Sequence, residues 1–234
     1  MIDYSNILPS EPILPVPPPA LAQLRSGGYR WMQQARRRAL IFAAARQLVT
    51  EDGYDHVSIR RLAERSGVTP PTIYNLIGGR GEVLHSALKE AFNVKASFAA
   101  ARARIENINP VLAYADTLWI CLSREPRYSE QVIIAVTRSV DRALTRMITG
   151  MSTAMILGWL EELRSAGAMR RTAELPRVAD LISRQLITSV AIWANGEICL
   201  QQLRKDLEMG VGLMLLGIAE PSEALRIEAW LSRH

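Results

Sequence analysis

The chain has 234 residues, 49% of them hydrophobic, and a formal net charge of +5. This length and apolar content suffice for two domains with sizeable cores. The longest apolar stretch, residues 209–219, is shorter than the ~20 residues that cross a bilayer, so we expect no membrane span and a cytoplasmic protein.

The first 28 residues differ from the rest in composition. Six of the twelve prolines lie between Pro9 and Pro19. Since proline fixes φ and lacks an amide hydrogen, this segment favours extended polyproline II over helix. We expect residues 1–28 to be a disordered leader, with a partner-binding arm as an alternative.

A first helix is predicted over residues 36–52, because apolar side chains recur there at helical spacing from Ile41 to Val49. Gly53 is suited to end this helix in the left-handed conformation. Tyr54 directly behind it is expected to be a hydrophobic anchor.

Residues 58–76 predict two short helices that cross through a glycine turn. Ser58 is a suitable N-cap, the small Ala63 permits a close crossing, and Gly67 can end the first helix in the left-handed conformation. The apolar residues expected to face the core are Ile59, Leu62, Ala63, Ile73 and Leu76.

The second short helix begins near Thr69, a capping residue, and Pro70 or Pro71 fits its first turn, where no amide partner is needed. The residues left facing outward are Thr72, Tyr74 and Asn75. Such a pair is typical of a helix-turn-helix, whose second helix enters the major groove of DNA. A plain αα-hairpin in a helical protein is the alternative.

A glycine-aromatic step, a short helix with Ala, a Gly-Val turn, a Thr-x-x-Thr-hydrophobic-Tyr helix and a basic residue follow one another along this segment. They are Gly53-Tyr54, Ala63, Gly67-Val68, Thr69-Pro70-Pro71-Thr72-Ile73-Tyr74 and Arg80. In this pattern residues 36–92 resemble the DNA-binding domain of TetR-family transcriptional regulators.

The chain departs from the family pattern in three places. Leu76-Ile77 stands where a His-Phe pair is common, Arg80 replaces the usual Lys, and Gly81 replaces an acidic residue. Ile77 keeps an apolar plug and Arg80 keeps a phosphate-binding cation. The missing His removes one expected contact to the DNA backbone.

The resemblance implies an all-α fold with an N-terminal three-helix helix-turn-helix head, over residues 29–80. A larger helical effector-binding and dimerisation domain would follow over residues 81–234. The resemblance also implies a double-stranded DNA operator as partner, and an effector whose binding releases a repressor from it.

Roles within the head follow from the outward positions and from the resemblance. Thr72 and Asn75 are expected to reach base edges, and the resemblance implies that Tyr74 and Thr69 bind phosphates. A buried core position for Tyr74 is the alternative. The full set expected to contact DNA is Ser58, Arg60, Thr69, Pro71, Thr72, Tyr74, Asn75 and Arg80.

Charge supports this interpretation independently. From Arg25 to Arg80 there are ten arginines against four acidic residues, a net of +6 (10 − 4), while the whole chain is +5. The basic excess therefore lies on the head, where neutralised phosphates would release counterions. Arg25, Arg30 and residues 36–38 give a third alternative for the N-terminal segment, an arm that contacts the DNA backbone.

The rest of the chain predicts helices only, since no alternating strand pattern appears. A fourth helix is expected from near Gly81 to about Arg104. The further helices are expected over residues 110–122, 128–148 with a break within it as an alternative, 152–165, 176–192, 197 or 198 to 218, and from 221 onward.

Two late helices carry long apolar faces. The residues on them are Val178, Leu181, Ile182, Leu186 and Ile187 on one, and Leu200, Leu203, Leu207, Val211 and Leu215 on the other. The pair could form half of a four-helix homodimer interface, and a two-fold DNA site needs two heads. Intramolecular core is the alternative.

A small-molecule effector is expected in the larger domain. Large aromatic and Met residues are candidates for lining its pocket, although such residues belong to a core more often than to a ligand wall. The candidates are Phe98, Trp119, Met147, Met151, Met155, Trp159 and Trp193.

Catalysis is not expected, because the three histidines belong to no catalytic motif and no Gly-rich phosphate loop is present. Cys121 and Cys199 lack metal-ligand spacing and are expected to be buried thiols. We therefore expect no metal and no cofactor. A helical adaptor that binds protein without affinity for DNA is the alternative function.

Overall fold

The computed structural model describes residues 27–137 and 142–233. The predicted leader lies outside them except for its last two residues. The described helices are α1 (Gly27–Asp52), the 3₁₀ helix η2 (Tyr54–His56), α2 (Ile59–Ser66), α3 (Pro70–Leu76), α4 (Arg80–Glu106), α5 (Pro110–Arg124), α6 (Pro126–Thr137), α7 (Arg142–Ser165), α8 (Leu175–Ala194), α9 (Leu200–Leu216) and α10 (Pro221–Leu231).

The all-α prediction is confirmed. Within the described residues the extended pairing is a single isolated bridge between Met169 and Ala219. None of the described helices combines the length and the hydropathy needed to cross a membrane.

The chain forms two compact units, Met1–Glu90 and Ala91–His234, which divide within α4. The boundary expected between residues 80 and 81 falls in the first turn of α4. We refer to the described parts of these units as the head and, after the role expected for it from the sequence, the effector domain.

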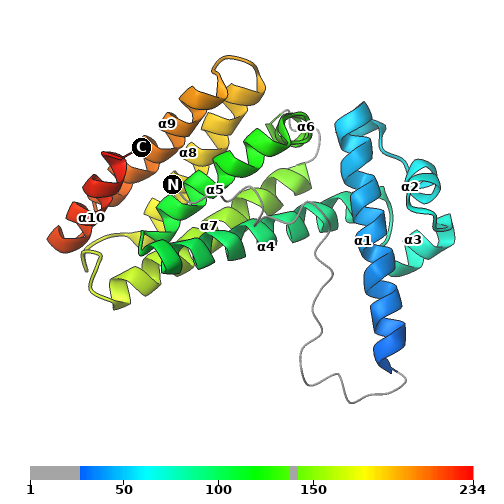
Figure 1. Ribbon diagram of the computed structural model, residues 1–234, viewed down its shortest axis with the longest axis horizontal. Helices are drawn as coiled ribbons and strands as arrows, with labels where there is room; N and C mark the ends of the chain where they lie inside the picture. Colours follow the sequence, from blue (N-terminus) through cyan, green and yellow to red (C-terminus); the bar gives the residue numbers. More distant parts are fainter. Residues whose placement is uncertain (1–26, 138–141, 234) are drawn as a thin grey trace. The chain divides into compact units, whose positions relative to one another are not determined.

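In the head, α2 and α3 pack against the C-terminal half of α1 (Figure 1). Apolar side chains from α1, η2, α2, α3 and the start of α4 form its core, and all are less than a tenth exposed. They include Ile41, Ala45, Leu48, Val49, Tyr54, Leu62, Ala63, Ile73 and Val83. The predicted periodicity of α1 and the anchoring role of Tyr54 are therefore confirmed.

The effector domain is built around α8, which packs on α6, α7 and α9, while α9 also packs on α5 and α10 (Figure 1). Asn109 caps α5 as its sequence predicts, because its Oδ1 accepts a hydrogen bond from the Val111 amide at 3.0 Å. Buried Glu223 of α10 accepts from Asn109 Nδ2 at 2.9 Å, which joins the two ends of this domain's sequence.

Two sequence-based expectations are wrong. A helix end near Ile148 does not occur, because α7 continues from Arg142 to Ser165 through Gly150, which lies exposed in open space. Cys199 is exposed and Cys121 half-buried, rather than both buried, and no disulfide joins them. Cys199 is exposed because it precedes the first turn of α9, outside the packed face of that helix.

The apolar faces of α8 and α9 serve mainly the core of the same chain. Leu203, Leu207, Val211 and Leu215 of α9 are completely buried. The other side of these two helices exposes large apolar side chains, which are Leu181, Met209 and Leu213. The row of leucines on α9 is therefore intramolecular core, which was the alternative to a dimer face.

Candidate nucleic-acid interface

The helix-turn-helix has the geometry that its sequence predicts. The Ser58 hydroxyl accepts a hydrogen bond from the Arg61 amide at 3.3 Å, which caps α2. Gly67 then ends α2 in the left-handed conformation, with a φ of 69°. A side chain is disfavoured at this angle, so glycine is what permits the turn into α3.

α3 has one buried and one exposed side. Ile73 is completely buried, whereas Tyr74 is 56% exposed and Asn75 is also exposed. The alternative in which Tyr74 is a core aromatic residue is therefore wrong. A short helix anchored by Ile73 presents its polar side to solvent, as a helix that enters a DNA groove must.

Thr69 and Thr72 interact directly at the start of α3. Their hydroxyl oxygens lie 2.9 Å apart, and the Thr69 side chain makes no capping bond to the helix. The Thr69 carbonyl oxygen instead accepts from the amides of Thr72 and Ile73. Thr72 is only half-buried, so this pair of hydroxyls reaches the surface of the head.

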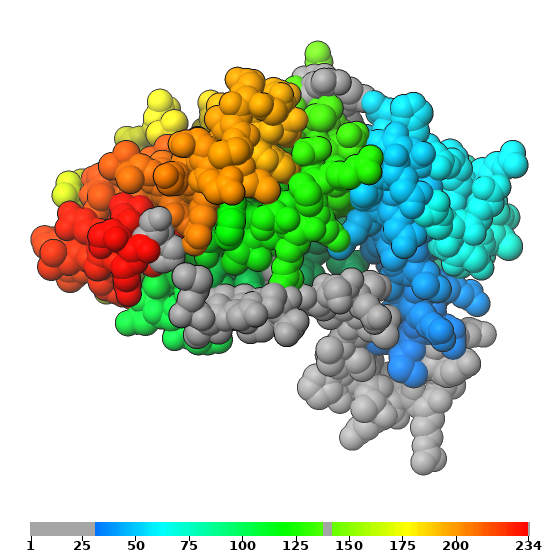
Figure 2. Space-filling view, turned by 45° about the horizontal axis from the view of Figure 1, so that its top comes forward, coloured from blue at the N-terminus to red at the C-terminus, as the bar shows by residue number. Residues whose placement is uncertain are grey.

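The predicted contact residues lie at the N-caps of α2 and α3, on these two helices and at the first residue of α4. Figure 2 shows α2 and α3 in cyan. The exposed members are Arg60, Thr69, Pro71, Tyr74 and Asn75, and the half-buried members are Ser58, Thr72 and Arg80. The Arg60 side chain is 87% exposed, and its Nε donates to Glu64 Oε1 at 2.9 Å one turn along α2.

Arg80 has partners within the head that the sequence did not reveal. Its Nε donates to the Val57 carbonyl oxygen at 2.7 Å and its Nη2 to the Tyr54 carbonyl oxygen at 2.6 Å. Its guanidinium also lies over the Tyr54 ring, 5.4 Å from the centroid. Arg80 therefore fastens the start of α4 to the corner that precedes α2.

Arg38 binds the C-terminal end of α3. Its Nη1 donates to the Leu76 carbonyl oxygen at 2.9 Å, at the last residue of α3. A cation at this position satisfies a free carbonyl and opposes the negative end of the helix dipole. Only long-range packing reveals this role, because the two residues are 38 positions apart.

Two more head arginines are paired with acids of α1. Arg65 binds Glu51 through two hydrogen bonds of 2.8 and 2.7 Å, and Arg61 forms an ion pair with Asp52. The hydrogen bond from Arg65 lowers the pKa of Glu51, and the same bond raises the pKa of Arg65. Two of the ten arginines counted in the predicted positive charge are therefore paired with acidic residues of the head itself.

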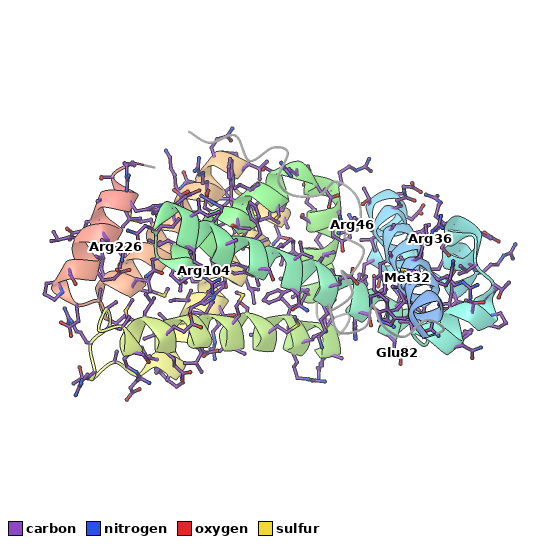
Figure 3. All side chains as sticks on the ribbon, turned by 60° about the horizontal axis from the view of Figure 1, so that its bottom comes forward. Met32, Arg36, Arg46, Glu82, Arg104 and Arg226 are labelled. Carbon is purple, nitrogen blue, oxygen red and sulfur yellow. The ribbon has the colours of Figure 1, made fainter. Side chains whose placement is uncertain are left out.

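Arg36 and Arg37 are exposed on α1, in the part that precedes the packed half of this helix. Figure 3 labels Met32 and Arg36 on this segment, and Met32 is 53% exposed. No acidic residue occurs between Gly27 and Leu40. This end of α1 is therefore a basic surface next to the α3 terminus that Arg38 binds.

The effector-pocket candidates do not form one group. Met147, Met151, Met155 and Trp159 are half-buried and recur every four residues on α7. Trp119 instead donates from Nε1 to the Leu200 carbonyl oxygen at 3.1 Å, with the Arg204 guanidinium 4.5 Å from its ring centroid. The other two candidates lie on different helices: Phe98 is half-buried on α4, and Trp193 is a core residue of α8.

An aromatic group joins α4, α5 and α7, and two of its members, Phe92 and Tyr114, were not singled out from the sequence. The ring centroids of Phe92 and Tyr114 are 6.2 Å apart, and those of Tyr114 and Trp159 are 5.9 Å apart. Burial raises the pKa of Tyr114, which is 4% exposed, so its hydroxyl stays neutral. Trp159 thus connects the half-buried row on α7 to α4 through Tyr114.

Charged residues are buried beside this group, between α4, α5 and α9. Asp116 accepts from Arg102 Nη1 at 2.7 Å and from Arg204 Nη2 at 3.2 Å, so that both of its oxygens are occupied. The two arginines also bind acids of their own helices, with distances of 3.1 Å between Arg102 and Glu106 and 2.7 Å between Arg204 and Glu208.

A family model matches most of the head. The model of bacterial regulatory proteins of the tetR family matches residues 41–84, which run from α1 to the start of α4. Among curated proteins, none matches the chain.

Solved structures share the fold over most of the chain. SmeT, the repressor of the Stenotrophomonas maltophilia multidrug efflux pump SmeDEF, superposes with a TM-score of 0.61 and 16% identity, over 80% of this chain and 92% of SmeT. Thermus thermophilus FadR, a TetR-family repressor solved with lauroyl-CoA, gives a TM-score of 0.60 and 19% identity, over 77% of this chain and 94% of that one.

The match at residues 41–84 covers the exposed α3 and the turn at Gly67, and the structural matches extend over both units. The chain thus carries a segment that matches the tetR-family DNA-binding domain at residues 41–84, and its fold resembles that of solved TetR-family regulators.

Proposed function

We propose that the chain is a sequence-specific transcriptional repressor that binds a two-fold DNA operator as a homodimer and leaves it when a small apolar effector binds. The observation that carries this proposal is α3, where buried Ile73 anchors a helix whose Tyr74 and Asn75 are exposed. The helix-turn-helix motif reads DNA with the exposed polar face of the helix that follows the glycine turn.

Each exposed residue is assigned a role by its chemistry. Asn75 pairs with adenine in the major groove, and Thr72 contacts a base edge or a thymine methyl group. Tyr74 and Thr69 bind phosphates, with Pro71 beside them in the first turn of α3. Ser58 and Arg60 lie against the backbone at the groove edge.

Arg80 acts first as a positioning residue. Two of its nitrogens already donate to the carbonyl oxygens of Val57 and Tyr54, so these donors are engaged inside the head. Its charge still attracts the DNA backbone, because its side chain is 36% exposed. Any phosphate contact of Arg80 is therefore secondary to its role in holding the head together.

Two heads are needed for a two-fold site, and the outer side of α8 and α9 supplies the dimer interface. Leu181 is 45% exposed, Met209 50% and Leu213 60%, on two helices that pack against each other. Burial of such side chains against a second copy would remove their apolar area from water.

Effector release is supported by the relatives. One solved structure of SmeT is a complex with triclosan, and T. thermophilus FadR is a repressor in complex with lauroyl-CoA. In this chain the half-buried row on α7 and the aromatic group of Phe92, Tyr114 and Trp159 offer an apolar surface for such a molecule. We place the effector against this surface.

A gel-shift experiment with DNA from upstream of the chain's own gene tests the proposal. We expect a retarded complex that a scrambled duplex of the same length does not compete away at equal concentration. A helical adaptor that binds only protein predicts no complex at low salt, and that result would reject the DNA-binding function.

A further inference from the structure

One cation of the effector domain has no counter-ion among the residues that the structure describes. Lys95 is half-buried on α4, and it makes no ion pair or hydrogen bond with any of them. It is one of only three lysines in a chain with 28 lysines and arginines.

Helical spacing places Lys95 on the inner side of α4. It follows Phe92 by three residues and precedes Ala99 by four and Arg102 by seven, so the four share one face of the helix. Ala99 and Arg102 are buried, and Phe92 contacts the buried Tyr114. The stem of Lys95 therefore lies along a face that packs on the rest of the effector domain.

Two carboxylates that bind Arg102 on this face are already engaged. Asp116, which faces α4 from α5, uses one oxygen for Arg102 and the other for Arg204. Glu106 binds Arg102 on the same helix. These two acids are therefore not available to Lys95, whose ammonium can pair with an anion supplied by a ligand.

An aromatic group begins on the same face of α4 as Lys95. Phe92 lies one turn before it, Tyr114 meets Phe92, and Trp159 continues the group to α7. Met155 lies one turn before Trp159 and packs against the same core. A molecule held here would meet one positive charge and an apolar wall.

We propose that the effector domain binds an apolar carboxylate, with the carboxylate paired to Lys95 and the apolar part against Phe92, Trp159 and Met155. The proposal rests on the effector role proposed above and specifies the chemical class of the effector. A charge-assisted hydrogen bond between the ammonium and the carboxylate gives the site its preference for anions.

The test uses the full chain without DNA, titrated by calorimetry with decanoate, decanol and decylamine, which share one chain length. We expect decanoate to bind about tenfold more tightly than decanol, as one charge-assisted hydrogen bond predicts. Decylamine should bind more weakly than decanol, because its charge has the same sign as that of Lys95.

Two variants and one control assign this preference to Lys95. Lys95→Met should lose the preference for decanoate while its affinity for decanol stays the same, and Lys95→Arg should keep the preference. Lys89→Met removes an exposed lysine of the same helix and should leave all three affinities unchanged. Circular dichroism of each variant checks that the helices are intact.

Equal affinities for decanoate and decanol, an unchanged preference in Lys95→Met, or no decanoate binding at about 1 mM would each overturn the proposal. Operator release is measured separately by gel shift. If decanoate binds through Lys95 and the operator stays bound, the carboxylate site stands and the release step of the proposed function is wrong.

Discussion

Arg80 donates a hydrogen bond to the main-chain oxygen of Tyr54 at 2.6 Å while its guanidinium lies over the Tyr54 ring. The bond joins the first residue of α4 to the corner between α1 and α2, 26 residues earlier. Arg80 thereby links α4, which follows α3 in the sequence, to the segment between α1 and α2, which precedes it.

Replacement of Arg80 should reduce the stability of the head as well as its affinity for DNA. Arg80→Ala removes two hydrogen bonds to carbonyl oxygens, each worth about 1 kcal/mol, so we expect a loss of about 2 kcal/mol in the free energy of unfolding. Arg80→Lys keeps the charge but not the planar fork, and should recover only part of the loss.

Chemical denaturation of the two variants measures this effect. A residue that served only as a phosphate contact would leave unfolding unchanged in Arg80→Ala and would alter only the salt dependence of operator binding. That result would show that the two hydrogen bonds contribute nothing to stability.

The turn at Gly67 provides a matched pair of glycine substitutions. Gly67 has a φ of 69° and Gly150 lies within α7, and a Cβ at either would meet no atom within 4 Å. Gly67→Ala should therefore destabilise by about 1 kcal/mol through its backbone conformation alone. Gly150→Ala should stabilise by up to about 1 kcal/mol, since alanine favours helix. Thermal unfolding that shifts both variants in the same direction would contradict this explanation.

Tyr74→Phe should weaken binding to every DNA sequence by a similar factor. Removal of one hydroxyl that binds phosphate costs about 1 kcal/mol, or about a fivefold loss of affinity, without a change in base preference. Fluorescence anisotropy measures the loss of affinity for an operator and the loss of affinity for an unrelated duplex. A loss confined to the operator would instead make Tyr74 a base-reading residue.

The dimer interface can be tested with two leucines of similar exposure. Leu213 is 60% exposed on α9 and Leu225 is 67% exposed on α10. Leu213→Glu should raise the dimer dissociation constant by about a hundredfold or more, because charges are costly at the centre of an interface. Leu225→Glu should have little effect. Analytical ultracentrifugation compares them, and a dimer that survives Leu213→Glu would place the interface elsewhere.

Local sequence signals were sufficient for the helix-turn-helix. The cap at Ser58, the turn at Gly67 and the buried Ile73 depend on residues that are close in sequence, and the structure has all three. The outward position of Tyr74 followed from the same spacing. These features could be predicted because each results from local backbone geometry.

Features that depend on distant residues could not be predicted. The binding of Arg38 to the end of α3, and of Asp116 to Arg102 and Arg204, joins helices whose contacts no local pattern reveals. For the same reason, the sequence left open whether the apolar row of α9 forms a dimer face or intramolecular core, and packing on α5 and α8 buries it.

The central claim, that the exposed side of α3 reads base sequence, is tested most directly by selection of binding sites from a random duplex pool with the natural chain and with Asn75→Ala. We expect the natural chain to enrich a two-fold symmetric site. Asn75→Ala should lose discrimination at one symmetric pair of positions, by about 1 to 3 kcal/mol each. Failure to enrich any site, or the same site with unchanged preference in Asn75→Ala, would contradict the account.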